Sequence, residues 1–241
     1  MKLALAITTA ALALAGCNFA NGMSGDVVQP SGSGGTRNFD VSGFTGVSLR
    51  GSDDVEVKTG ANFAVTAEGD SALLDKLEIR KDGDTLRIGR KDGDWKWGGN
   101  KGAKITVTLP KLLSASVAGS GDMIVDQAQG DFDGSIAGSG NLTVAQFRGG
   151  KADLSIAGSG DLRIAAGEAS EIDASIAGSG DIDAPTLKAA RGDISIAGSG
   201  SIRAQITGEA DISIVGSGDV ELTGGAKCSV SKMGSGSARC S

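Results

Sequence analysis

A near-invariant tetrapeptide, Ala-Gly-Ser-Gly, recurs through the C-terminal half of this chain at an almost constant interval. A period of about 20 residues indicates one supersecondary unit that is stacked repeatedly on itself, not a globular core closed once. The spacings are 19, 20, 20, 20, 18 and 18 residues. The first glycines of the motif are Gly119, Gly138, Gly158, Gly178, Gly198, Gly216 and Gly234.

Each repeat has the pattern of two short strands joined by a glycine corner. Residues 171–177 alternate apolar and polar side chains, and residues 161–165 do the same after the preceding corner. That alternation is typical of a half-buried strand. Glycine suits the corner because it adopts positive φ without a steric penalty. The sequence therefore predicts an all-β fold, a single right-handed parallel β-helix with about 20 residues per coil.

Aligning the repeats on the corner separates inward from outward positions. The inward positions hold aliphatic residues and Phe132, and their columns are expected to stack into a narrow core. The clearest of them are Val125, Ile136, Leu142, Val144, Leu154, Ile156, Leu162, Ile164, Ile176, Ile194, Ile196, Ile212, Ile214 and Leu222.

The N-terminal half lacks this period but is also rich in strand patterns. We expect strands at 46–50, 54–58, 63–67, 77–81, 85–90 and 104–109, with one helical turn at 71–77 capped by Ser71 or Asp70. We interpret residues 37–113 as irregular coils that cover one end of the core, and residues 114–241 as the regular repeats. Together they form one domain, 37–241.

Several motifs in this domain carry a family resemblance. They are Phe44-Thr-Gly-Val-Ser-Leu, Asp54-Val-Glu-Val-Lys, Phe63-Ala-Val-Thr-Ala-Glu-Gly-Asp, Leu86-Arg-Ile and Ile105-Thr-Val-Thr-Leu-Pro, followed by the Gly-Ser-Gly series. In this order they resemble the bacterial autotransporter-adhesin head known as the GIN domain, over about residues 37–241. The resemblance implies a β-helix related in shape to pectin-lyase-like proteins, a role in adhesion and no established catalytic residues.

The first residues read as an export signal. Lys2 precedes an apolar stretch, residues 3–15, which ends in Leu14-Ala-Gly-Cys17. This ending resembles the bacterial lipoprotein box, so we expect residues 1–16 to be a lipoprotein signal peptide and Cys17 to be lipidated. The alternative is an ordinary signal peptide cut near Ala20. By resemblance to Gram-negative sorting rules, Asn18 favours the outer membrane.

A Gly-, Ser- and Asn-rich segment follows the cysteine. Residues 17–36 are expected to form a flexible tether between a lipid anchor and the β-helix. Apart from the signal, no apolar segment is long enough to cross a membrane as a helix. The expected partners are therefore the membrane, through the anchor, and a surface glycan or protein. The sequence leaves the oligomeric state and the exposed leaflet open.

Composition excludes several function classes. The chain has no histidine, which removes His-based acid–base catalysis, Ser-His and Cys-His nucleophile pairs and the usual zinc sites. Its net charge is −6, and it has no basic patch interleaved with aromatic residues, so nucleic acid is not an expected partner. Carboxylates are plentiful, but most recur at outward repeat positions, which a structural repeat explains better than a glycosidase pair does.

One loop holds both tryptophans of the chain. Trp95 and Trp97 lie in the Gly-rich segment 91–100. Paired loop aromatics can stack on sugar rings or on a protein surface, so we consider them for ligand contact. The alternative is that they cover the end of the β-helix.

Aspartates recur in register on the outer face of the repeats. One column precedes the corner and is followed two residues later by serines; a second column follows the corner, at Asp122, Asn141, Asp161, Asp181, Ser201 and Asp219. Such columns are expected to be solvated and to help the turns. The alternative is weak calcium association, because calcium prefers oxygen ligands. The candidate calcium column is Asp133, Asp153, Asp173, Asp193 and Asp211. No other cofactor is expected.

The two remaining cysteines fall in the last repeat. In the alignment Cys228 takes the inward position of Ala210, and Cys240 takes that of Leu222. With Cys17 lipidated, an exported chain has an even pair left, so we expect a disulfide across the last coil.

These observations together favour an outer-membrane lipoprotein that serves as a non-catalytic adhesion or binding module. Two alternatives stay open at this point. One is a polysaccharide-processing or polysaccharide-binding protein of the envelope with a pectin-lyase-like shape, and the other is a structural spacer with no ligand.

Overall fold

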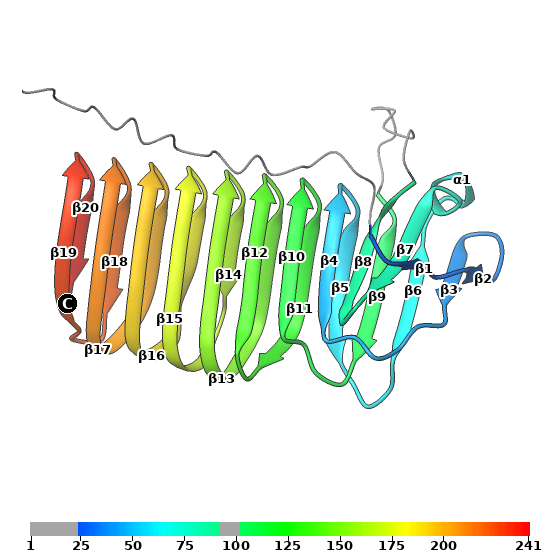
Figure 1. Ribbon diagram of the computed structural model, residues 1–241, viewed down its shortest axis with the longest axis horizontal. Coiled ribbons are helices and arrows are strands. Elements are labelled where there is room, and N and C mark those ends of the chain that lie inside the picture. The colour runs from blue at the N-terminus through cyan, green and yellow to red at the C-terminus, as the bar shows by residue number, and fades with distance from the viewer. Residues whose placement is uncertain (1–23, 92–101) are drawn as a thin grey trace, which may run out of the picture.

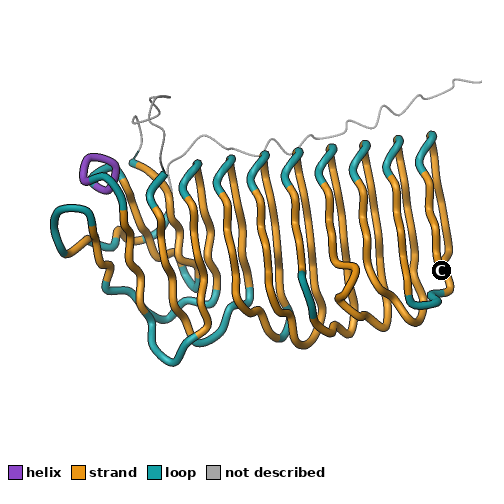
Figure 2. Tube along the Cα trace, turned by 180° about the vertical axis from the view of Figure 1, so that it is seen from behind, coloured by secondary structure: helices purple, strands orange, loops and turns teal. Residues whose placement is uncertain are grey.

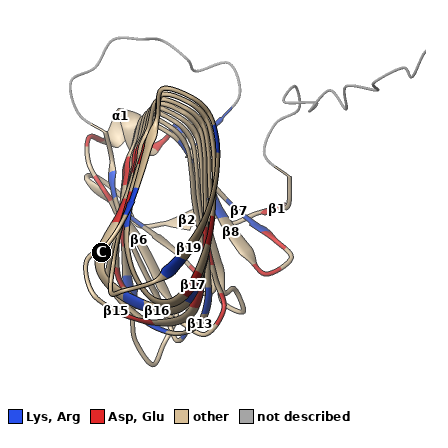
Figure 3. Ribbon diagram, turned by 90° about the vertical axis from the view of Figure 1, so that its left-hand side faces the viewer, with Lys and Arg blue, Asp and Glu red and all other residues tan. Residues whose placement is uncertain are grey.

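The computed structural model describes residues 24–91 and 102–241, which form a rod of stacked coils (Figure 1). All strands belong to one continuous 20-stranded sheet. The sheet folds back at each Gly-Ser-Gly corner, so the rod has two long walls when viewed end-on (Figure 3). We name the wall whose strands run into the corner the entry wall, and the wall whose strands leave it the exit wall. The turns opposite the corners form the base.

The regular part of the rod alternates between these walls. The entry wall contains β10 (Ser114–Gly119), β12 (Phe132–Gly138), β15 (Gly167–Gly178) and β19 (Lys227–Gly234). The exit wall contains β11 (Asp122–Gln129), β14 (Asp161–Ile164), β18 (Asp219–Thr223) and β20 (Ser237–Cys240). Three long strands leave a corner on the exit wall, bend through the base and continue along the entry wall: β13 (Asn141–Gly158), β16 (Asp181–Gly198) and β17 (Ser201–Gly216).

Strand pairing in this region is parallel and keeps one register. Ile136 pairs with Ile156, Ile156 with Ile176, and each corner glycine pairs with the corner glycine of the next coil. A register shift occurs where β16 meets β17, at the base, and it absorbs the change of coil length there. The predicted parallel β-helix is therefore confirmed.

The corners lie along one edge of the rod, where Figure 2 draws them as a row of loops. Each corner contains two glycines, and the structure requires glycine at both positions. Gly178 has φ +139°, a conformation that side chains rarely adopt. Gly180 has no such φ, but a Cβ there would lie 2.1 Å from the carbonyl oxygen of Gly160 in the preceding coil. Both glycines therefore allow the coils to approach closely, and the first also adopts a backbone conformation that other residues avoid.

The core is the narrow space between the walls. Every inward residue that the sequence alignment singled out is buried, including Ile156, Leu162 and Ile176. Aromatic residues fill the space near the base, where the rings of Phe132 and Phe147 lie 6.2 Å apart in a tilted pair. The core therefore runs along the rod as stacked aliphatic columns.

The first two coils do not follow chain order. One coil consists of β4 (Gly46–Gly51) and β5 (Asp54–Thr59), and the next of β8 (Thr85–Arg90) and β9 (Lys104–Leu109). The β4–β5 coil pairs with β8–β9 on one side and with β10–β11 on the other. The β8–β9 coil therefore lies at the end of the rod, outside the β4–β5 coil. After β9 the chain crosses to the other side of the β4–β5 coil, where the regular repeats begin with β10.

Antiparallel strands cover this end of the rod. On β8 lies β7 (Leu77–Asp82), followed by β1 (Asp26–Val27). On β9 lies β6 (Ala64–Glu68), followed by β3 (Thr36–Phe39) and β2 (Pro30–Ser31). The predicted cap over one end is present, and its pairing is antiparallel, unlike that of the coils.

The six strands predicted for this half lie within one residue of their predicted bounds, and the helical turn begins at Ser71 as predicted but ends at Leu74, three residues before the predicted end. Helix α1 (Ser71–Leu74) is capped by Asp70, whose carboxylate accepts the backbone N–H of Ala72 at 2.9 Å. Leu74 is buried and seals the end of the core. The polar side chain before the helix satisfies a backbone donor that the helix itself leaves free.

The ordered fold begins earlier than the expected tether boundary at residue 36. Asp26 and Val27 pair with Lys81 and Arg80, and Pro30 pairs with Phe39. Strands of two residues are too short to show hydrophobic alternation. The Gly-, Ser- and Asn-rich composition of this segment therefore predicts a tether and not the strands β1 and β2. None of the residues 24–91 and 102–241 forms a helix long and apolar enough to cross a membrane.

Candidate functional site

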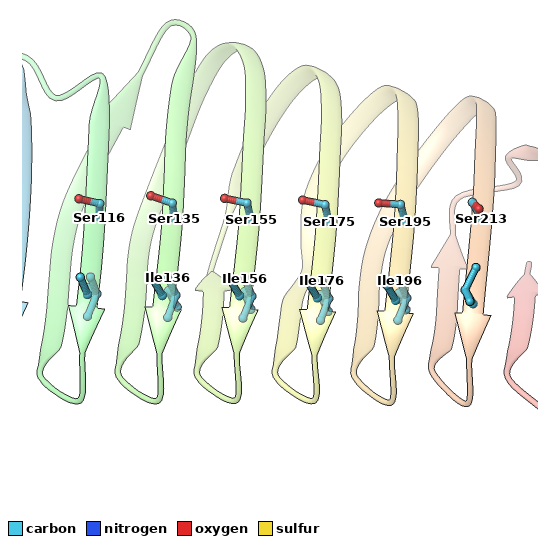
Figure 4. Close-up of a pocket in the computed structure, with 17 residues that line it drawn as sticks. Ser116, Ser135, Ile136, Ser155, Ile156, Ser175, Ile176, Ser195, Ile196 and Ser213 are labelled. Atoms are coloured by element: carbon cyan, nitrogen blue, oxygen red, sulfur yellow. The ribbon is translucent and has the colours of Figure 1, made fainter. Parts of the chain in front are cut away.

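The entry wall presents a continuous stripe of small side chains. Two outward columns run along it and line an open groove with a volume of about 570 Å³ (Figure 4). The serine column contains Ser116, Ser135, Ser155, Ser175, Ser195 and Ser213, and the alanine column contains Ala118, Ala137, Ala157, Ala177, Ala197 and Val215. Because neighbouring strands lie about 4.8 Å apart, the shallow groove presents the same two side chains, serine and alanine, at a regular spacing.

The serine hydroxyls along the groove share one orientation. From Ser116 to Ser195 they point toward the preceding coil, whereas Ser213 differs (Figure 4). Ser116 donates a hydrogen bond to the hydroxyl of Ser48 at 2.8 Å. Toward the C-terminal end the alanine column changes to Val215, which is 54% exposed, and Met233, which is 73% exposed. The stripe therefore becomes more apolar along its length.

The acidic column considered for calcium lies beside the serines. Its five aspartates stack in register, from Asp133 to Asp211, as the alignment predicts. Partial burial, together with repulsion from Asp153, raises the pKa of Asp133 above its usual value. Lys151 contacts Asp173 at 2.9 Å and so neutralises part of the column. Within 24–91 and 102–241, no three His, Cys, Asp or Glu residues form a group that could hold a metal ion.

A column of alternating charge lies next to the acidic one, and the sequence reasoning missed it. Lys151, Glu171, Arg191, Glu209 and Lys227 are successive partners in the strand register. Glu171 pairs with Lys151 at 3.4 Å and with Arg191 at 3.7 Å. The alternation is readable once the repeats are aligned two positions before the aspartates. It converts stacking of like charges into stacking of opposite charges.

The aspartate column after the corner has a structural role. Asp161 accepts the backbone N–H of Asp181 at 3.2 Å, and Asp181 accepts that of Ser201 at 2.8 Å. Each side chain thus satisfies a donor of the next coil, where the corner interrupts the strand ladder. At the end of the column, Asp219 accepts both the hydroxyl and the backbone N–H of Ser237, and these bonds lower its pKa. The expectation that aspartates help the turns is confirmed here.

Further along the exit wall the charges alternate again. Arg163 and Arg203 both contact Asp183, and Arg203 also lies 3.8 Å from Glu221. These exposed pairs contribute little stability individually. A second open groove of about 520 Å³ runs between this column and the capping aspartates, with Asn141 and Thr143 in its lining. Its surface is more polar than that of the entry wall.

Three of the predicted site residues lie outside the described residues: Cys17, Trp95 and Trp97. The structure does describe both sides of the tryptophan segment. Asp53, whose side chain is 1% exposed, binds Arg90 on one side and the backbone N–H of Ala103 on the other. No sequence pattern points to this role, because Asp53 is one of many aspartates in predicted turns.

The cysteine pair lies in the last coil. Cys228 on β19 and Cys240 on β20 are joined by a disulfide, with their Cα atoms 6.7 Å apart. The bridge crosses the core between the two walls at the positions that the repeat alignment assigns to them.

Comparison with known proteins agrees with this architecture. Residues 43–226 match the family described as "Putative auto-transporter adhesin, head GIN domain". A putative adhesin from Bacteroides fragilis has the same fold, with a TM-score of 0.78 at 23% identity, over 88% of this chain and 99% of that one. A protein from Parabacteroides distasonis described as a putative lipid binding protein superposes with a TM-score of 0.69 at 26% identity, over 86% and 96% of the two chains.

A putative adhesin from Parabacteroides merdae has a TM-score of 0.67 at 20% identity, over 86% of this chain and 95% of that one. No curated protein matches the chain. The description of the family suggests an adhesion-like module of the cell surface or envelope rather than an enzyme. The family match covers most of the chain and includes both the irregular coils and the repeats, so the chain belongs to the family described as "Putative auto-transporter adhesin, head GIN domain".

Proposed function

We propose that this protein is a non-catalytic adhesion module that binds an extended surface ligand along the entry wall. The observation that carries the proposal is the groove over the serine and alanine columns, which crosses successive coils without interruption. A ligand built of repeating units can make the same contact at every coil. Weak contacts repeated in this way add up to a useful affinity.

The chemistry of the groove supports binding rather than catalysis. Its side chains are small, and the hydroxyls of the serine column supply hydrogen-bond donors and acceptors. Of the five carboxylates in the neighbouring acidic column, Asp173 is bound to Lys151. The full sequence contains no histidine to serve as a general base.

The proposed location is the outer membrane, with the chain anchored through a lipid on Cys17. The Leu14-Ala-Gly-Cys17 box after an apolar stretch supports this location. Intact-mass measurement of membrane-extracted protein is expected to show a lipid adduct at Cys17, and Cys17→Ser is expected to stop acylation and processing. An unmodified cysteine would remove this part of the proposal.

The binding proposal is tested with the soluble chain from Arg37 onward, and with a longer version from Ser24 that retains β1 and β2. Both are applied to a glycan array, to lipid vesicles and to whole cells; the vesicles are included because one structural relative is described as lipid binding. The test variant is Ala157→Arg with Ala177→Arg, which places two large charges on exposed positions of the groove. The matched control is Ile124→Arg, at a 57% exposed position of the exit wall.

We expect the double variant to lose binding and the control to keep it, with both retaining the unfolding midpoint of the parent. Equal binding by the parent and the double variant would contradict the entry-wall assignment. Failure of the parent to bind any glycan, vesicle or cell surface would instead favour a structural spacer.

A further inference from the structure

The base of the rod contains a hollow that the entry-wall proposal does not use. It is an open groove of about 810 Å³ that spans three successive coils. Its lining comes from Gln146, Arg148 and Gly149 of the first coil, residues 167–170 of the second, and Lys188 of the third. We name it the base groove.

The turns that line the hollow carry small residues in two of the three coils. Gly149 and Ala169 are register partners, and Gly167 lies between Phe147 and Leu187 in the register. A side chain at Gly167 would meet the carbonyl oxygen of Phe147 at 2.0 Å, so this position stays without a side chain unless the backbone moves.

Three charged side chains stand in one column along this groove. Arg148, Glu168 and Lys188 are successive register partners, and all three are exposed. In the described part of the chain none of them has an ion-pair partner within 4 Å. The neighbouring column of Lys151, Glu171 and Arg191 is ion-paired. Arg148 and Lys188 are therefore available to a ligand, and one Glu168 carboxylate cannot neutralise both.

The position of these cations is unusual for this rod. Residues 114–222 contain six basic residues and sixteen acidic ones, and four of the six basic residues lie at the base, at Arg148, Lys151, Lys188 and Arg191. In the end-on view, ribbon segments coloured for Lys and Arg lie among the base turns, beside segments coloured for Asp and Glu (Figure 3). Acidic residues share the base with these cations, and Lys151 and Arg191 are paired with Glu171, so the cations left for an approaching anion are Arg148 and Lys188.

We propose that the base groove binds a short stretch of an anionic polysaccharide, one whose sugars carry carboxylate groups. Arg148 and Lys188 are separated by two coils, about 10 Å at the usual strand spacing. They would bind two anionic groups of one extended chain, on alternate sugars. The hydroxyl of Ser170 and the amide of Gln146 line the same groove and would hydrogen-bond to sugar hydroxyls.

Glu168 decides which anions fit. It lies between the two cations and repels any negative charge placed over the middle coil. A polymer with a charge on every unit meets this repulsion, whereas one with spaced charges avoids it. The same carboxylate can accept a hydrogen bond from a sugar hydroxyl in that position. The arrangement therefore favours a glycan over a densely charged chain such as polyphosphate.

The site is tested by calorimetric titration and by amide NMR shifts at 146–149 and 167–170. The ligand probes are an oligogalacturonate with alternate carboxylates methyl-esterified, the fully ionised oligogalacturonate, a neutral galactan and polyphosphate. The test variant is Arg148→Gln with Lys188→Gln. The matched control is Arg163→Gln with Arg203→Gln, which removes the same charge from the exit wall. Glu168→Gln forms a third arm.

We expect the partly esterified oligogalacturonate to bind, with weakening as sodium chloride is raised. The test variant should lower its affinity about tenfold, from two lost charge-assisted contacts, while the control changes it by less than about twofold. Glu168→Gln should raise affinity for the fully ionised probe. The proposal is overturned by equal loss in test and control variants, by equal binding of the neutral galactan, or by binding of polyphosphate alone. The entry-wall variant Ala157→Arg with Ala177→Arg separates the two sites, because it should leave this titration unchanged.

Discussion

The carboxylate of Asp53 receives two hydrogen bonds from the guanidinium of Arg90, at 2.8 and 3.1 Å, in a site where its own side chain is 1% exposed. It also accepts the backbone N–H of Ala103 at 2.9 Å. Arg90 ends β8, and Ala103 precedes β9, so one side chain joins both strands of the outer coil to the first corner. A buried carboxylate bound by three N–H groups is costly to remove, because all three hydrogen bonds are lost in a site that water does not fill freely.

The first prediction follows from this contact. Asp53→Ala is expected to lower the free energy of unfolding by about 2–4 kcal/mol, since it removes the carboxylate bound to a partly buried guanidinium and to the backbone N–H of Ala103. Asp54→Ala is the control, because Asp54 is exposed in the next position. Urea unfolding followed by circular dichroism measures both variants. Equal stability of the two would show that the Asp53 contact is dispensable.

The second prediction concerns the corner. Gly178→Ala is expected to destabilise the rod by about 3 kcal/mol or more, because alanine is strained at φ +139° and its Cβ would lie 2.1 Å from the carbonyl oxygen of Gly158. Ser179→Ala, at the exposed middle of the same corner, should change stability by less than about 0.5 kcal/mol. Thermal unfolding of both variants is the measurement. A well-tolerated alanine at Gly178 would mean that the corners can relax.

The third prediction uses two aspartates whose pKa values shift in opposite directions. The pKa of Asp133 is raised by partial burial and by the charge of Asp153. The ionised carboxylate therefore destabilises the fold at neutral pH, and this cost is absent below the pKa of the unfolded chain, where the group is protonated in both states. Asp133→Asn should therefore stabilise the protein at pH 7, with the gain disappearing below about pH 4. Hydrogen bonds from Ser237 lower the pKa of Asp219, so that carboxylate stabilises the fold above its unfolded pKa. Asp219→Asn should destabilise at pH 7, and this loss should shrink as pH falls through the folded pKa.

Unfolding midpoints measured from pH 3 to pH 8 test this pair. The two difference curves should have opposite signs and should converge at low pH. Parallel curves would show that the asparagines act through packing rather than through charge.

Much of the rod could be predicted because its local and long-range signals coincide. When coils have a constant length, aligning the Gly-Ser-Gly corners also aligns the strands. The 20-residue spacing therefore predicts directly that Ile156 and Ile176 are register partners. The first coils have no repeat, and nothing local to β4 or β8 says that the β8–β9 coil lies outside the β4–β5 coil. That order depends on pairings between segments far apart in the chain.

The candidate sites also differ in how far the sequence predicts them. The serine and alanine columns follow directly from the repeat. The base groove does not, because its lining comes from base turns that differ in length and composition from coil to coil. The buried role of Asp53 also required the structure, since many other aspartates of this chain occupy exposed turns.

The fourth prediction concerns the acidic column on the entry wall. Stacked carboxylates about 5 Å apart repel, so monovalent salt should raise the unfolding midpoint by screening them. The variant with Asp153, Asp173 and Asp193 changed to Asn should respond less to salt. Calcium at matched ionic strength is the second arm. An added calcium response that the variant lacks would indicate bridging between neighbouring carboxylates, and an equal response in both proteins would leave the column a solvated face.

The last prediction concerns the bridge between β19 and β20. Cys228 and Cys240 are 12 residues apart, and closing a loop of this size stabilises a fold by about 3 kcal/mol in the chain-entropy model. Replacing both cysteines by serine should therefore lower the unfolding free energy by up to that amount. The loss should appear first as faster amide hydrogen exchange in residues 227–240, because the contacts of this coil are fewer than those of a coil in the middle of the rod. Exchange in β12 and β15 should keep its protection at low denaturant, which makes these strands the internal control. Thiol counting on the unfolded, non-reduced protein from Arg37 onward should find no free thiol, and two free thiols would show that the bridge is absent in solution.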